Sequence, residues 1–165
     1  MTPQLALFNE ADDAAARTLL LRCVDVPRWA AEVSAGRPYA DVEKVLTAAR
    51  TAAPGWTDAE LAAALAHHPR IGERPAGDDA GAAHSRREQA GVGTDAETAR
   101  RLLDGNRAYE DRFGHVFLIR AAGRSAAEIL AALEERLGND PVTERSITAE
   151  QLREIAVLRL QKELT

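Results

Sequence analysis

The chain has 165 residues, of which 45% are hydrophobic, 28% are charged and only 4% are aromatic, and its formal net charge is −5. This length and balance suit one soluble globular domain and exclude an intrinsically disordered chain. The acidic balance disfavours a general nucleic-acid binder, because such proteins carry a basic stripe or patch. Alanine fills much of the hydrophobic share, and since alanine is the best helix former, the composition predicts an all-α fold.

Cysteine usage and apolar runs indicate the cellular compartment of the protein. The single cysteine, Cys23, excludes an intramolecular disulfide and a cysteine-cluster metal site. No apolar run approaches the roughly 20 residues of a membrane span, and residues 1–8 lack the basic start and apolar stretch of a secretory signal. We therefore expect a cytoplasmic protein with no membrane partner.

Capping residues divide the first half of the chain into short helices. Asn9 and Asp41 are typical helix caps, Pro27 suits a first helical turn, and Thr57-Asp58-Ala59-Glu60 is a capping box. After the capping box, Leu61, Leu65 and His68 share one helical face. We expect helices at about residues 9–23, 27–33, 41–53 and 57–68.

The second half begins with a loop at residues 72–83, which are rich in Gly, Pro and Asp. Capping boxes at Ser85, Thr94 and Ser125 each predict a helix. The apolar run 116–119 lies between Gly114 and Gly123 and predicts a buried extended segment. Further helices are therefore expected from 85 to 91 or 93, over 94–113 and 125–137, and from 140 onward as one helix or two. The sequence predicts a single-domain helical bundle over residues 1–165, with a short buried extended segment before the last two helices.

His68 is a candidate acid or base. Its face of the predicted helix is apolar, and Pro69 stops the helix and favours an extended conformation at His68. A histidine held at a helix end and followed by a long loop suits proton transfer. The alternative is a histidine that hydrogen-bonds in the core or caps the helix C-terminus.

Two further segments allow a structural and a functional interpretation. Ser85 and Glu88 have the spacing of a capping box, yet Glu88 could instead orient a histidine while Ser85 and Gln89 bind a polar ligand. Arg159 shares the apolar stripe of the last helix, so its guanidinium needs either a structural carboxylate or a bound anion.

Metal and Schiff-base chemistry are both disfavoured. The sequence lacks the His-Glu-x-x-His pattern, and adjacent histidines such as His67 and His68 point about 100° apart on a helix. The only lysines are Lys44 and Lys162, and both lie in polar surroundings rather than in the desolvated site that a Schiff base needs.

Several motifs from Phe8 to Leu160 together resemble the 2-oxo-4-hydroxy-4-carboxy-5-ureidoimidazoline (OHCU) decarboxylase family of urate degradation. Their order and spacing carry the resemblance. They are Phe8-Asn9, His68-Pro69-Arg70-Ile71-Gly72, Ser85-x-x-Glu88-Gln89-x-Gly91, Asn106-x-x-Tyr109-x-x-Arg112-Phe113-Gly114-His115-Val116-Phe117-Leu118-Ile119, Glu128-Ile129-Leu130, Arg136-Leu137-x-Asn139, and Glu154-Ile155 with Arg159-Leu160.

The resemblance implies an all-α homodimer that needs no cofactor and no metal. It implies a small anionic ureidoimidazoline substrate, converted to (S)-allantoin and carbon dioxide, with His68 as the catalytic histidine and Glu88 as its partner. The implied substrate-binding residues are Pro69, Ser85, Gln89, Phe117, Leu118, Ile119, Arg120, Ala121 and Arg159. Two alternatives remain at this point, namely a metal-dependent hydrolase of a ureido compound and a non-enzymatic helical binding module.

Overall fold

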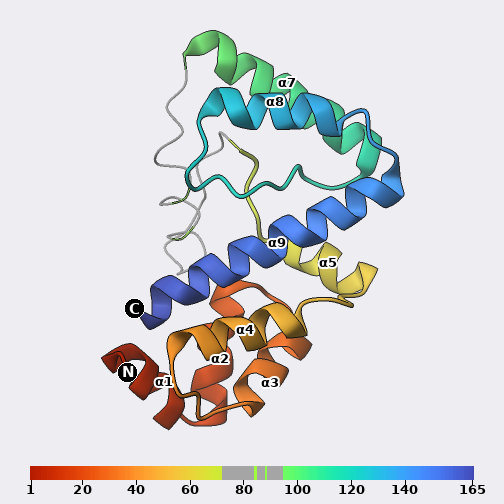
Figure 1. The fold of residues 1–165 in the computed structure, drawn as a ribbon. Coiled ribbons are helices and arrows are strands. Elements are labelled where there is room, and N and C mark those ends of the chain that lie inside the picture. Colours follow the sequence, from red (N-terminus) through yellow and green to blue (C-terminus); the bar gives the residue numbers. More distant parts are fainter. Residues whose placement is uncertain (72–83, 85–87, 89–94) are drawn as a thin grey trace. The chain divides into compact units, whose positions relative to one another are not determined.

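The computed structural model describes residues 1–71, 84, 88 and 95–165. Within these residues all regular secondary structure is helical, which confirms the predicted all-α class (Figure 1). The chain divides into two compact units, one formed by Met1–Ala64 with Arg153–Thr165 and the other by Leu65–Leu152. The expected loop at residues 72–83 lies outside the described residues. Among the described helices, none is long and apolar enough to cross a membrane.

The first unit contains the N-terminal helices and the end of the last helix. In it α2 packs against α3, and α3 packs against α4. The Trp29 side chain is fully buried and its indole Nε1 donates to Ala49 O at 2.9 Å, so α3 and α4 are joined through their shared core. The helices are α1 (Pro3–Glu10), α2 (Asp13–Cys23), α3 (Pro27–Ala35), α4 (Val42–Ala52), α5 (Asp58–Leu65) and the later part of α9 (Pro141–Leu164).

Most of the predicted caps are present, but the cap predicted at Asn9 is wrong, and the one predicted at Thr94 lies at Asp95 instead. Asp41 accepts from the backbone N–H of Lys44 at 2.9 Å, and the capping box is closed in both directions, with Thr57 N donating to Glu60 Oε1 and Glu60 N donating to Thr57 Oγ1. Asn9 caps no helix. It lies inside α1, and its amide exchanges two 2.9 Å hydrogen bonds with the backbone of Tyr39.

The second unit contains α7 (Ala96–Phe113), α8 (Ala126–Arg136) and the first part of α9. α7 and α8 pack side by side and run in the same direction, because the connection between them returns along the pair (Figure 1). Gly114 ends α7 in the left-handed conformation, with φ of 78°. Asp95, rather than the predicted Thr94, is the residue that caps α7, by accepting from Thr98 N at 2.8 Å.

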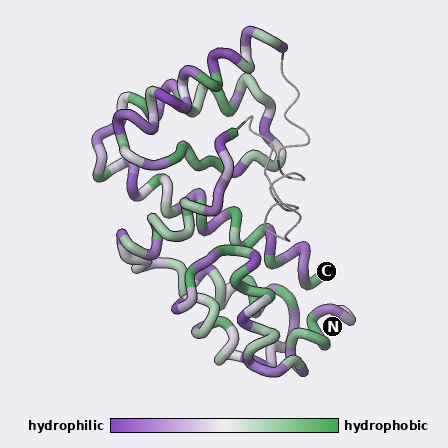
Figure 2. Tube along the Cα trace, turned by 180° about the vertical axis from the view of Figure 1, so that it is seen from behind, coloured by the Kyte–Doolittle hydropathy of each residue, from purple (hydrophilic) through white to green (hydrophobic). Residues whose placement is uncertain are grey.

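The returning connection is the predicted buried extended segment. Residues 116–121 form no helix and no strand, and Phe117, Leu118 and Ile119 are buried there. Figure 2 shows this run as hydrophobic. Its side chains form one core cluster with side chains of α7 and α8 and with Ile71, which follows α5. The members of this cluster are Ile71, Leu102, Tyr109, Phe117, Ile119, Ala121, Ile129, Leu130 and Leu133.

The structure answers the open question about the last helix and corrects the predicted end of α5. α9 is one continuous helix of 24 residues, so one helix rather than two follows residue 140. α5 ends at Leu65, three residues before the predicted end at His68. Pro69 explains the difference, because a proline has no N–H to donate to the carbonyl four residues earlier, which is that of Leu65. His68 N donates to Leu65 O instead, at 3.0 Å.

Candidate active site

His68 lies just beyond the end of α5 and is half-buried. The turn that follows α5 holds its backbone through the hydrogen bond to Leu65 O. The next residue, Pro69, is also half-buried and fixes the direction in which the chain leaves. The predicted candidate acid or base is therefore partly shielded from water and still accessible.

The segment that follows His68 is fastened to α7. Arg70 and Glu110 form a two-armed ion pair, with Arg70 Nε donating to Oε1 at 2.7 Å and an Arg70 Nη donating to Oε2 at 3.1 Å. Asn106 Nδ2 donates to Ile71 O at 3.0 Å, and the Ile71 side chain enters the core cluster. Sequence reasoning gave Asn106 only as part of a motif and missed this contact.

Of the acidic and amide residues predicted near His68, the structure describes only Glu88. Glu88 is helical and half-buried in the same unit as His68. Ser85 and Gln89 lie outside the described residues, so their predicted roles stay predictions. His84 is helical and almost completely buried.

Segment 117–121, which is predicted to bind the substrate, belongs to the same unit as His68. A buried arginine on α8 fixes its conformation, since Arg136 Nη1 donates to Leu118 O at 2.7 Å and the guanidinium lies 4.6 Å from the centre of the Phe117 ring. The backbone N–H of Arg120 donates to Gln151 Oε1 at 2.9 Å. The Arg120 guanidinium donates to Ala122 O at 2.6 Å, so this side chain braces its own loop.

Arg136 belongs to a buried polar network that joins three helices. Its Nε donates to Glu144 Oε1 at 2.7 Å, and the Tyr109 hydroxyl donates to the same oxygen. Burial and the hydrogen bond to Glu144 raise the pKa of Tyr109, so its hydroxyl stays protonated as the donor. Asn139 Nδ2 donates to the second carboxylate oxygen at 3.2 Å. The network fixes the Leu118 carbonyl relative to α7, α8 and α9.

Arg159 lies in the other unit, on the later part of α9. Its side chain is only 4% exposed, which agrees with the predicted position on the apolar stripe. A guanidinium nitrogen donates to Cys23 O at 3.3 Å. Burial raises the pKa of the Cys23 thiol to about 12, so this residue is an unreactive, buried side chain.

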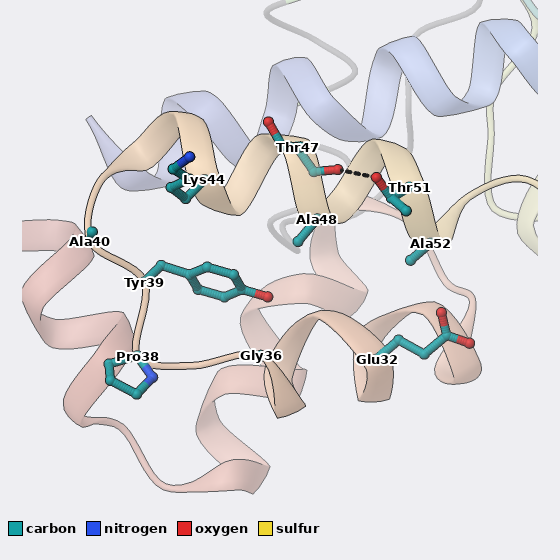
Figure 3. A pocket seen from close by; sticks show the side chains of 10 residues that line it. All are labelled: Glu32, Gly36, Pro38, Tyr39, Ala40, Lys44, Thr47, Ala48, Thr51 and Ala52. Carbon is teal, nitrogen blue, oxygen red and sulfur yellow. Dashed lines mark hydrogen bonds between the residues drawn. The ribbon is translucent and has the colours of Figure 1, made fainter.

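A separate hollow of about 670 Å³ lies between α3, α4 and the chain that joins them (Figure 3). The Tyr39 ring extends along it, and the Tyr39 hydroxyl donates to Val33 O at 2.8 Å. None of the predicted site residues lines this hollow. In the part of the chain that the structure describes, no three His, Cys, Asp or Glu side chains are grouped as metal ligands.

Comparison with known protein families adds a decisive observation. The family model described as OHCU decarboxylase matches residues 9–161, which include every predicted site residue. The chain belongs to the OHCU decarboxylase family.

Two relatives show how far the match extends. The chain is 36% identical over 138 residues to the 2-oxo-4-hydroxy-4-carboxy-5-ureidoimidazoline decarboxylase of Amia calva, covering 82% of this chain and 79% of that protein. It is 31% identical over 144 residues to the uric acid degradation bifunctional protein TTL of Arabidopsis thaliana, covering 85% of this chain but only 44% of that protein. The chain thus spans less than half of the bifunctional relative.

Two solved structures have the same fold as this chain. A crystal structure of OHCU decarboxylase in the presence of (S)-allantoin matches with a TM-score of 0.74 and 27% identity, over 92% of this chain and 97% of that one. A crystal structure of (S)-allantoin synthase matches with a TM-score of 0.71 at 18% identity, over 97% of this chain and 54% of that one, and supports the fold alone.

Proposed function

We propose that this protein is a carboxy-lyase that converts OHCU to (S)-allantoin and carbon dioxide without a cofactor, with His68 as acid/base and Glu88 as the group that orients it. The observation that carries the proposal is the OHCU decarboxylase family match over residues 9–161. The identity of 36% to the Amia calva decarboxylase supports the same reaction.

The chemistry asks little of the protein beyond placement and one proton. The bond between ring carbon C4, which also carries the hydroxyl, and the carboxylate breaks, and carbon dioxide leaves. The electron pair forms a C4–C5 double bond as the ring carbon–nitrogen double bond at C5 opens and its nitrogen takes up a proton. A proton then adds to one face of C5, which carries the ureido group, and the C4 hydroxyl loses its proton as C4 becomes the ring carbonyl of allantoin. Because the substrate supplies its own electron sink, the protein must orient it, stabilise the oxyanion and deliver the proton. A half-buried histidine such as His68 suits the last task.

The segment 117–121 is proposed to bind the ring through its backbone. The Leu118 carbonyl is turned toward Arg136. In a planar trans peptide the following N–H points the opposite way, so the Ile119 N–H faces away from Arg136. Such a fixed N–H can donate to a ring carbonyl or to the developing oxyanion.

The remaining ligands in the proposal are side chains. Pro69, Ser85 and Gln89 would contact the ureidoimidazoline near His68, and Arg159 would hold an anionic group with its guanidinium. The net charge of −5 gives an anionic substrate no general attraction, so local donors of this kind are required.

The experiment compares two neighbouring histidines. Substrate is generated in place by urate oxidation, and the optical activity of the allantoin is followed. We expect His68→Asn to abolish catalysed conversion and to leave slow, racemic product, while His67→Asn at the exposed neighbouring position keeps normal activity. Unchanged far-UV circular dichroism shows that both variants are folded. An active His68→Asn enzyme would contradict the assignment of His68.

The same assay separates the two alternatives. A metal-dependent hydrolase would lose activity in the presence of a strong chelator, whereas the proposed decarboxylase keeps it. A non-enzymatic binding module would leave the intermediate to decay at its uncatalysed rate and give racemic allantoin even with the unmodified protein.

We also propose a cytoplasmic homodimer in which residues 1–165 form a single domain. The unbroken family match over residues 9–161 supports the single domain, and the lone buried Cys23 suits a reducing compartment. Light scattering should give twice the chain mass of 17.8 kDa, and a mass equal to that of one chain would refute the dimer.

A further inference from the structure

The core face of α7 carries a polar side chain where an apolar one would be expected. Leu102, Asn106 and Tyr109 are the buried residues of this helix, and Asn106 is only 2% exposed. A buried amide is costly unless its polar atoms are hydrogen-bonded. Asn106 Nδ2 donates to Ile71 O, but no described residue donates to Asn106 Oδ1. The amide oxygen is therefore buried without a described hydrogen-bond donor, which lowers the free energy of unfolding. Packing alone does not explain why an amide occupies this position.

The contact that Asn106 does make lies three residues after His68. Between the hydrogen bond from His68 N to Leu65 O and the one from Asn106 to Ile71 O, only Pro69 and Arg70 intervene. Pro69 has a fixed φ, and Arg70 is held on α7 by Glu110. The chain on both sides of His68 is thus restrained, with little freedom left in between.

We propose that Asn106 is a positioning residue for His68, which it holds in place through the Ile71 carbonyl. This inference rests on the proposed catalytic role of His68. The Arg70–Glu110 pair supports the same segment but is 45% and 22% exposed, so it contributes less than the buried amide. Loss of the Asn106 donor releases the Ile71 carbonyl and lets His68 move relative to a substrate held by other groups. Misplacement by about 1 Å can reduce turnover on the order of a hundredfold.

The key variant is Asn106→Leu. It removes the donor to Ile71 O and also the buried acceptor that lacks a described partner, so these two effects on the free energy of unfolding offset each other. We expect stability within about 1 kcal/mol of the parent, kcat reduced by about ten- to a hundredfold, and KM within about threefold, because the substrate ligands are untouched.

The matched control is Leu102→Ala, one turn earlier on the same buried face. This change removes core volume and should lower the free energy of unfolding by about 2–5 kcal/mol. It leaves the Ile71 carbonyl held, so kcat at 25 °C should stay within about twofold of the parent. If kcat instead falls in proportion to the loss of stability, so that Leu102→Ala is less active than Asn106→Leu, the proposal is wrong.

Asn106→Asp provides a second test that does not depend on how well the leucine variant folds. A protonated carboxyl can donate to Ile71 O, whereas a carboxylate cannot. Its kcat should therefore fall with rising pH through an additional ionisation that the parent lacks. A pH profile identical to that of the parent would contradict the positioning role.

The outcomes distinguish this inference from the proposed function. If Asn106→Leu keeps the parent kcat while His68→Asn is inactive, the positioning role is wrong and the function stands. If His68→Asn is active, the function itself fails.

Discussion

Replacing Arg136 by methionine should strongly destabilise the protein. The side chains of Arg136 and Glu144 are only 7% and 0% exposed, and Arg136 also donates to Leu118 O. Without Arg136, the Glu144 carboxylate keeps Tyr109 and Asn139 as donors but has no buried cation beside it. Removing one partner of a buried ion pair costs about 3–5 kcal/mol.

Two controls test whether burial is the reason. The Arg101–Glu134 pair joins α7 to α8 in the same unit, but its side chains are 48% and 52% exposed. Arg101→Met should therefore cost less than about 1 kcal/mol. The double variant Arg136→Met/Glu144→Leu removes both buried charges and should be more stable than Arg136→Met alone.

The assay is urea unfolding followed by far-UV circular dichroism, together with thermal melting. For a chain of this size each kcal/mol shifts Tm by about 2–4 °C, so Arg136→Met should lower Tm by roughly 6–20 °C. A loss no larger than that of Arg101→Met would refute the reasoning. So would a double variant that is less stable than Arg136→Met.

Three other predictions follow from single residues. Burial raises the pKa of Cys23 from 9.0 to about 12, so the thiol of the unfolded chain loses its proton at lower pH than that of the folded chain. The free energy of unfolding should therefore fall as pH rises from about 9 toward 12, and this fall should be smaller in Cys23→Ala. A Cβ at Gly105 would lie 2.6 Å from Leu133 Cδ2 in the core, so Gly105→Ala should lower the urea midpoint and cost roughly 1–2 kcal/mol despite its better helix propensity. Arg159→Lys keeps the charge but loses the planar fork, so the KM of the decarboxylation should rise about tenfold while kcat changes less.

Local signals in the sequence predicted the helices well because capping is a local interaction. Thr57 with Glu60, Asp41 and Ser125 all cap as their spacing predicts. The same rule could have found α1, which begins with Thr2 as cap and Pro3 in the first turn.

Contacts between distant residues were not predictable in this way. Asn9 has a capping side chain, but its hydrogen bonds go to Tyr39, thirty residues away. Similarly, the sequence placed Asn106 in a motif without revealing its bond to Ile71 O, because the spacing of 35 residues follows only from how α7 packs. For His68, the motif gave the residue while the structure supplied the restraint on its backbone.

In the second unit, α7 holds both candidate site segments, the one that follows His68 and the one that contains Leu118. On the side of His68, Asn106 and Glu110 hold the chain directly. On the side of Leu118, the restraint passes from the Tyr109 hydroxyl through the Glu144 carboxylate to the Arg136 guanidinium, which donates to Leu118 O. Both segments also place side chains in the same core cluster as α7. A displacement of α7 would therefore carry both segments together, so the spacing between His68, the proposed proton donor, and the backbone proposed to bind the ring depends on one helix rather than on the loops themselves.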